Sequence, residues 1–231
     1  MSAPGVADGP SLAERLATVT DRVAEAARSA GRDPGELTTI VVTKFHPASL
    51  VRELHALGVR DFGENRHQEA REKAAELADL ELTWHFIGQL QTKKARQARE
   101  YARVIHSIDR EALVAALATG EPTVDCFLQV NLTDDPGRGG AAPAEVEALA
   151  ESIAAAPALN LLGVMGVAPL GEEPRPAFAR LRGIGERVAR IVPGATSLSA
   201  GMSHDFAEAI AEGATHLRIG TAITGNRPAR D

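Results

Sequence analysis

The amino-acid sequence predicts an α/β protein folded as a single (β/α)₈ barrel, on three observations. Eight short apolar or alternating segments are separated by longer amphipathic segments, a rhythm that is typical of parallel strands joined by helices. Eight strands are the number that closes such a barrel. No Gly-x-Gly-x-x-Gly motif follows the first strand segment and little chain follows the eighth, which favours a closed barrel over an open, doubly wound sheet.

A leader and one helix precede the barrel segments. Residues 1–10 are small and rich in Gly and Pro, without the basic region of a signal peptide, and predict a disordered leader. The barrel domain is expected to span residues 11–231. Ser11 and Glu14 have the spacing of a capping box, and apolar residues recur at helical spacing from there to Gly31. We expect this helix to cover the place of a missing eighth barrel helix, and we expect no C-terminal β domain.

The strand segments are short and rich in Val, Ile, Leu, Phe and Thr. We predict strands at residues 37–44, 60–64, 83–87, 104–108, 124–132, 159–167, 196–200 and 216–219. The helical segments carry apolar residues at helical spacing, and Pro47, Pro143 and Pro176 mark three of their starts, where the missing N–H of proline is tolerated. We predict helices at residues 47–58, 66–78, 92–101, 110–119, 143–156, 176–192 and 205–212.

The composition excludes several classes of function. The chain has 231 residues, a formal net charge of −6 and 44% hydrophobic residues, which is enough for a core but leaves no basic excess to neutralise nucleic-acid phosphates. No apolar run reaches the length of a membrane span. Cys126 is the only cysteine and lies in an apolar run, which indicates a buried structural residue and a cytoplasmic protein without disulfides.

Lys44 is the most informative residue because it closes the first strand segment. The chain has only three other lysines, Lys73, Lys93 and Lys94, and all of them lie in polar helical sequence. A lysine that is partly withdrawn from water has a lowered pKa and presents a free amine, which attacks carbonyl carbons. The alternative is a lysine whose stem lies along apolar surface while its ammonium group reaches solvent.

The eighth strand segment directs an arginine toward the same end of the barrel. Side chains alternate across a strand, so Leu217 and Ile219 point toward the helices and Arg218 points toward the barrel mouth. A buried guanidinium group needs an acceptor. That acceptor is either a ligand or, in the alternative, a salt-bridge partner such as Glu64 or Asp109.

The loops after the seventh and eighth strands have the composition of a phosphate site. They contain Ser199-Ala-Gly-Met-Ser203 and Gly220-Thr-Ala-Ile-Thr-Gly225. Glycine allows close backbone approach, and amides and hydroxyls donate to phosphate oxygens, at the two loops that recurrently bind phosphate in this architecture. Together with Lys44, they predict a ligand with a phosphate and a carbonyl group. Pyridoxal 5′-phosphate (PLP) fits, because its aldehyde forms a Schiff base with lysine.

Seven stretches, in order along the chain, are similar to those of a known family. They are Val41-Val-Thr-Lys44, Phe62-Gly-Glu-Asn65, Trp84-His-Phe-Ile-Gly-Gln-Leu-Gln91, His106-Ser-Ile-Asp109, Gly163-Val-Met-Gly-Val-Ala-Pro169, Leu198-Ser-Ala-Gly-Met-Ser-His-Asp205 and Arg218-Ile-Gly-Thr-Ala-Ile223. Through them the chain resembles the pyridoxal phosphate homeostasis proteins, barrel proteins related to the N-terminal domain of alanine racemase. Two loops differ from the family's usual pattern, at Lys93-Lys94 and at Arg138, which leaves their roles open.

The resemblance implies a barrel of PLP fold type III in which Lys44 forms the covalent internal aldimine with PLP. It places Ser203, Gly220 and Thr221 at the phosphate, Ser199 near it, Arg218 at the pyridine nitrogen, and Asn65 and Met165 along the pocket. It implies PLP as the cofactor and no metal.

The same resemblance favours a binding protein over an enzyme. An arginine at the pyridine nitrogen keeps that nitrogen unprotonated and makes the ring a weaker electron sink. Racemisation needs a base on each face of the α-carbon, and related racemases take a tyrosine from a second domain. The only tyrosine here, Tyr101, is predicted to pack at the end of a barrel helix.

We predict a noncatalytic PLP carrier in vitamin B6 and amino-acid homeostasis. The alternatives are a weak PLP-dependent amino-acid racemase and a sugar-phosphate barrel enzyme with a Schiff-base lysine.

Further predictions concern histidines and partners. His85 and His106 lie in strand segments and are predicted to be hydrogen-bonded barrel residues, since no companion stands at metal-ligand spacing. The basic helical run from Lys93 to Arg103 is predicted to be a solvated face, with a partner surface as the alternative. The protein is expected to be a monomer that binds neither nucleic acid nor membranes, with PLP-dependent apo-enzymes as candidate partners.

Overall fold

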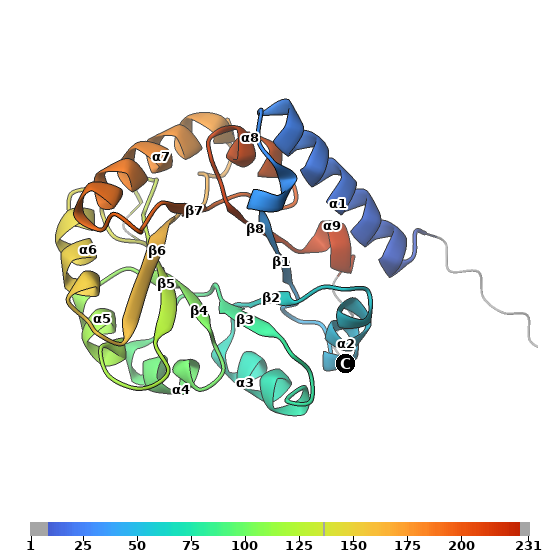
Figure 1. The fold of residues 1–231 in the computed structure, drawn as a ribbon, viewed down its shortest axis with the longest axis horizontal. Helices are drawn as coiled ribbons and strands as arrows, with labels where there is room; N and C mark the ends of the chain where they lie inside the picture. Colours follow the sequence, from blue (N-terminus) through green and yellow to red (C-terminus); the bar gives the residue numbers. More distant parts are fainter. Residues whose placement is uncertain (1–8, 136, 227–231) are drawn as a thin grey trace, which may run out of the picture.

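The computed structural model describes residues 9–135 and 137–226 and shows a closed barrel of eight parallel strands in chain order (Figure 1). The predicted (β/α)₈ barrel is therefore confirmed. Its strands are β1 Thr38–Val42, β2 Asp61–Glu64, β3 Thr83–Phe86, β4 Val104–Ile108, β5 Val124–Gln129, β6 Leu159–Met165, β7 Ser197–Ser199 and β8 His216–Ile219. The first strand is shorter than predicted, so Lys44 lies in the turn after β1 and not in the strand itself.

The helices form a ring around the barrel, as predicted (Figure 1). They are α1 Leu12–Ser29, α2 Ala48–Ala56, α3 His67–Glu76, α4 Ala95–Arg99, α5 Glu111–Leu117, α6 Val146–Ala154, α7 Pro174–Ile191, α8 Phe206–Ala211 and α9 Thr221–Thr224, with 3₁₀ turns η1 Pro34–Glu36 and η2 Thr92–Lys94. The prediction lacks α9, because four residues are too few for a helical period to be detected. Of the predicted leader, only Gly9 and Pro10 are among the described residues.

Helix α1 covers the barrel beside β8 and β1, as the sequence predicts. The Ser11 hydroxyl accepts a hydrogen bond from the Glu14 amide, and the Glu14 carboxylate accepts one from the Ser11 amide, which confirms the capping box. The helix packs against α8 and α9 (Figure 1). Arg15 Nε donates to the carbonyl oxygen of Ile223 at 2.7 Å, so α1 also anchors the short α9.

Alternate strand residues divide between the outer core and the barrel interior. Leu217 and Ile219 are buried in the main apolar core with residues of the helices, which confirms their predicted orientation. Arg218, between them, points into the barrel together with His85 and His106. The barrel interior is therefore partly polar, and the polar groups lie below its carboxyl-terminal rim.

Gly163 permits the pairing of β6 with β7. Its φ is 155°, and a Cβ atom there would lie 1.8 Å from the carbonyl oxygen of Ser197.

We predict that Gly163→Ala lowers the free energy of unfolding by more than about 3 kcal/mol, because the backbone of the neighbouring strand would have to move. Chemical denaturation measures this loss. The control Gly183→Ala lies in α7, where a Cβ meets nothing within 4 Å, and is expected to raise stability by up to about 1 kcal/mol. Similar stabilities of the two variants would contradict the prediction.

Candidate functional site

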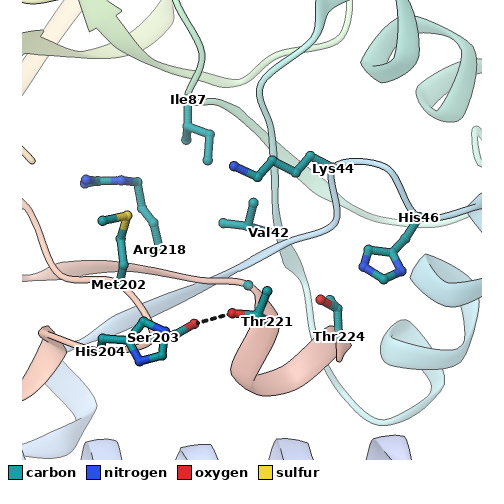
Figure 2. Close-up of a pocket in the computed structure, with 11 residues that line it drawn as sticks. Val42, Lys44, His46, Ile87, Met202, Ser203, His204, Arg218, Thr221 and Thr224 are labelled. Atoms are coloured by element: carbon teal, nitrogen blue, oxygen red, sulfur yellow. Dashed lines mark hydrogen bonds between the residues drawn. The ribbon is translucent and has the colours of Figure 1, made fainter. Parts of the chain in front are cut away.

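A cavity lies at the carboxyl ends of β1, β3, β7 and β8 (Figure 2). Its volume is about 240 Å³, close to the lower end of the range for small-molecule sites. It is lined by Val42, Lys44, His46, Ile87, Met202, Ser203, His204, Arg218, Gly220, Thr221 and Thr224. This is the barrel end at which proteins of this architecture bind their ligands.

Lys44 enters the cavity from the turn after β1. Its side chain is half-buried, and Figure 2 shows its amine between Val42 and Ile87 and facing Arg218. A primary amine at this position can reach a carbonyl group of a ligand bound in the cavity.

Lys73, Glu64 and Glu69 form a buried set of charges between β2 and α3, here called the ionic cluster. Lys73 Nζ lies 2.7 Å from Glu64 Oε1 and 2.8 Å from Glu69 Oε1, and the side chains of Lys73 and Glu64 are only 7% and 1% exposed. Burial raises the pKa of Glu64, and the ammonium group of Lys73 opposes this shift. The suggested salt bridge between Glu64 and Arg218 is therefore wrong, because α3 brings Lys73 to that carboxylate instead.

The ionic cluster holds both residues that flank Lys44. The ammonium group of Lys73 donates to the carbonyl oxygen of Thr43 at 2.8 Å. Thr43 Oγ1 donates to Glu64 Oε1 at 2.8 Å, and the amide of Phe45 donates to Glu69 Oε1 at 2.5 Å. Phe45 has a φ of 69°, a conformation that costs a non-glycine residue about 1 kcal/mol or more. These bonds hold the turn in that conformation and so determine where the side chain of Lys44 leaves the backbone.

Arg218 contributes a buried positive charge to the same cavity. Its Nη1 donates to Ser199 Oγ at 2.6 Å, and its Nη2 donates to the carbonyl oxygen of Gly166 at 3.0 Å. Burial lowers the pKa of Arg218 to about 10, so the guanidinium group is charged at neutral pH. The suggested salt bridge with Asp109 is also wrong, because Asp109 pairs with Arg110 at 2.5 Å.

Hydroxyl and amide groups gather on another wall of the cavity, where the loop after β7 meets the start of α9 (Figure 2). Thr221 Oγ1 donates to Ser203 Oγ at 3.5 Å, and the Ala222 amide donates to the same oxygen at 3.3 Å. The loop turns at Gly201, whose φ is 91° and where a Cβ would lie 3.0 Å from the Cα of Phe206. This wall presents several small donors and suits an anion such as phosphate.

Five of the residues that the sequence predicts at the site line the cavity, namely Lys44, Ser203, Arg218, Gly220 and Thr221. The other three lie deeper or to one side. Ser199 is fully buried beneath the cavity against Arg218, and Met165 packs in the barrel interior against Phe127. Asn65 follows β2, and its Oδ1 is buried without a hydrogen-bond partner.

Six lining residues are absent from the sequence-based prediction, namely Val42, His46, Ile87, Met202, His204 and Thr224. Strand alternation identifies Val42, which lies two residues before Lys44 on the same face. Most of the remaining side chains come from loops, and Thr224 comes from the short α9, so no period indicates their direction.

The two strand histidines and the cysteine that the sequence analysis considers are buried inside the protein. His85 and His106 are hydrogen-bonded to each other at 3.0 Å inside the barrel, as predicted. Cys126 is fully buried, and burial raises the pKa of its thiol, as expected of a structural residue. Within residues 9–135 and 137–226, no group of three or more His, Cys, Asp or Glu side chains is arranged to hold a metal ion. None of the helices in those ranges has the length and apolar character needed to span a bilayer.

Comparison with known proteins places this barrel in the class of alanine racemase-like barrels. The family model of the alanine racemase N-terminal domain matches residues 15–228. The alanine racemase of Corynebacterium glutamicum has the same fold, with a TM-score of 0.72 and 15% identity over 93% of this chain and 62% of that chain.

Within this class, the chain belongs to the pyridoxal phosphate homeostasis protein family. The pyridoxal phosphate homeostasis protein of Pseudomonas aeruginosa is 45% identical over 94% of this chain and 96% of its own length, and that of Escherichia coli is 38% identical over 94% and 97%. PipY of Synechococcus elongatus, in its structure with PLP bound, has a TM-score of 0.82 and 40% identity over 93% of this chain and 100% of that chain. The resemblance identified from the sequence is confirmed.

Loss of the ammonium group from the ionic cluster is expected to destabilise the protein. Lys73→Met leaves Glu64 buried without its counter-charge, so we predict a loss of about 3–5 kcal/mol in the free energy of unfolding. The matched control Lys93→Met removes an exposed ammonium group on η2 and is expected to change stability by less than about 0.5 kcal/mol. Urea denaturation at pH 7 compares the two. Equal stabilities of the two variants would contradict the predicted cost of leaving Glu64 without its counter-charge.

Proposed function

We propose that this protein is a PLP carrier that holds PLP as a Schiff base on Lys44. The observation that carries the proposal is that a lysine amine, a buried arginine and a hydroxyl-rich turn line one cavity. These groups match the aldehyde, the pyridine nitrogen and the phosphate of PLP. The amine of Lys44 adds to the aldehyde carbon and one water molecule leaves; hydrolysis reverses the step and releases PLP.

In this proposal, each wall of the cavity binds a different part of PLP. The hydroxyls of Ser203 and Thr221 and the backbone at Gly220 hold the phosphate. Arg218 has five N–H donors, of which two bond inside the barrel, and another donates to the pyridine nitrogen. Because Arg218 keeps its charge, it disfavours a proton on that nitrogen. Asn65, Met165 and Ser199 complete the surroundings of the ring.

Two features support a carrier over an enzyme. An unprotonated pyridine nitrogen withdraws electrons weakly, so a carbanion at the α-carbon of an amino acid gains little stabilisation. Tyr101, the only tyrosine, is outside the set of lining residues, and its hydroxyl lies 3.2 Å from His67 Nδ1. Burial also raises the pKa of Tyr101, so little of the phenolate form that could accept a proton is present at neutral pH. The names of the relatives, pyridoxal phosphate homeostasis proteins, agree with this role.

The carrier is proposed to act as a monomer in the cytoplasm, with PLP-dependent apo-enzymes as recipients. A single buried cysteine suits a reducing compartment. Reversible imine formation suits transfer, because a bound aldehyde is kept from reacting with other amines and is still recoverable.

A weak amino-acid racemase is the second candidate, and one observation favours it. His46 and His204 line the cavity on the same side of the barrel as Lys44. Burial lowers the pKa of His46, which leaves its ring neutral and able to accept a proton at pH 7.

Borohydride reduction tests the Schiff base. We expect the wild-type protein mixed with PLP to show an imine absorbance band that borohydride bleaches, with the added mass on the peptide that contains Lys44. Lys44→Ala is expected to lose both the band and the added mass, whereas Lys93→Ala, at an exposed lysine, retains them. Covalent labelling that persists in Lys44→Ala would refute the lysine assignment. A wild-type protein with no imine band would favour the sugar-phosphate alternative.

Hydrogen exchange at the α-carbon separates the carrier from the racemase. We expect L-alanine incubated with the loaded protein in deuterium oxide to exchange its α-proton no faster than with free PLP, as measured by NMR. His46→Gln and His204→Gln are expected to leave that rate unchanged. Fast exchange that either substitution abolishes would establish the second candidate instead.

A further inference from the structure

A line of hydrogen-bonded side chains crosses the barrel interior beneath the cavity. It joins Asp61 of β2, His85 of β3, His106 of β4, Ser199 of β7 and Arg218 of β8, and is here called the interior chain. The successive distances are 2.9 Å from Asp61 Oδ1 to His85 Nε2, 3.0 Å from His85 Nδ1 to His106 Nε2, 2.9 Å from His106 Nδ1 to Ser199 Oγ, and 2.6 Å from Ser199 Oγ to Arg218 Nη1. Because Asp61 is the first residue of β2, the chain connects the cavity to a carboxylate at the opposite end of the barrel.

A single arrangement of hydrogens gives every bond of the interior chain one donor and one acceptor. In this arrangement each histidine ring carries only one hydrogen on nitrogen. Arg218 only donates, so Ser199 Oγ accepts from it and directs its own hydrogen at His106 Nδ1. The Asp61 carboxylate only accepts, so His85 carries its hydrogen on Nε2 and accepts at Nδ1. His106 therefore carries its hydrogen on Nε2 and donates to His85. The reverse direction would put a second proton on His85 or leave a bare ring nitrogen facing Asp61.

Burial stabilises this single arrangement. His106 and Ser199 are fully buried and His85 is 3% exposed, so their polar atoms depend on partners inside the protein. Burial lowers the pKa of His106 well below the ordinary histidine value, which keeps the ring neutral as the chain requires. The ring of Phe127 stacks on His106 with centroids 4.5 Å apart and restrains the plane of the imidazole. The side chain of Asp61 is 32% exposed, so solvent reaches the charged end of the chain.

We propose that the interior chain fixes the plane of the Arg218 guanidinium group and ends on the carboxylate of Asp61. The carboxylate whose charge acts directly on Arg218 is that of Asp205, outside the interior chain. Asp61, His85 and His106 are then positioning residues for the hydrogen bond from Arg218 to the pyridine nitrogen, an inference that rests on the proposed function. A carboxylate in direct contact would cancel much of the positive potential at that nitrogen. A chain of neutral dipoles orients the guanidinium group and leaves its charge facing the cavity.

The direction of the chain is tested on the protein without PLP. We expect ¹⁵N NMR of the histidine rings at pH 7 to show His85 and His106 as neutral rings that carry hydrogen on Nε2. An imidazolium, or hydrogen on Nδ1 of either ring, would overturn the direction and with it the proposal. This measurement does not depend on PLP.

The effect on the site is tested with PLP labelled with ¹⁵N in its ring. Asp61→Asn removes the charge but keeps an oxygen that accepts from His85, whereas His106→Leu breaks the interior chain. Both are expected to move the ring nitrogen resonance and to raise the Kd for PLP. His106→Leu is expected to raise it about tenfold, the effect of losing about one hydrogen bond to a charged group, and Asp61→Asn by a smaller factor. His106→Asn keeps an acceptor for Ser199 and is expected to restore part of the affinity. Asp125→Asn is the matched control, because the Asp125 carboxylate bonds to Asn160 outside the chain and its loss leaves resonance and affinity unchanged.

The outcomes separate this proposal from the function on which it rests. If folded Asp61→Asn and His106→Leu proteins keep the wild-type resonance and Kd, the positioning role is refuted while PLP binding stands. If the wild-type protein takes up no PLP, the proposed function is refuted together with this role.

Discussion

The pairing of β1 with β8 is the contact on which the site depends. It closes the barrel in parallel register, with Ile40 opposite Arg218. Parallel strands end at the same rim, so this register brings the turn that carries Lys44 next to the turn that begins at Gly220. Residues from opposite ends of the chain meet there because the sheet closes on itself. In an open sheet β1 and β8 would not pair, and Lys44 and the hydroxyl-bearing turn at Gly220 would not share one cavity.

Two buried polar assemblies then position the groups that face the cavity. The ionic cluster around Lys73 holds the residues before and after Lys44, and the interior chain holds Arg218 from below. Burying these charges costs about as much as their attraction returns, so the intact assembly adds little net stability, even though removing one partner of a buried pair is costly. Their contribution is to position groups at the cavity: hydrogen bonds hold the backbone on both sides of Lys44 and hold the guanidinium group of Arg218 directly. A protein that binds a reactive aldehyde at one end and an anion at the other needs both positions held together.

Strand alternation accounts for most of what could be predicted. It gives the outward direction of Leu217 and the inward direction of Arg218 from one short segment, and the position of Lys44 at a strand end is visible from the sequence alone. Strand alternation does not identify which side chains from other elements meet these residues. Glu64 meets Lys73 because of how α3 lies over β2, and the contact of His85 with a second histidine depends on the β3–β4 register. A strand's own sequence contains neither fact.

The central claim is that both ends of PLP are held in one cavity, the aldehyde by Lys44 and the phosphate by the turns after β7 and β8. A crystal structure of the protein grown with PLP tests this most directly. The account predicts electron density continuous from Lys44 Nζ into the cofactor, with the phosphate against Ser203 and Thr221. Density that is separate from Lys44, or a phosphate that lies elsewhere on the barrel, would contradict it.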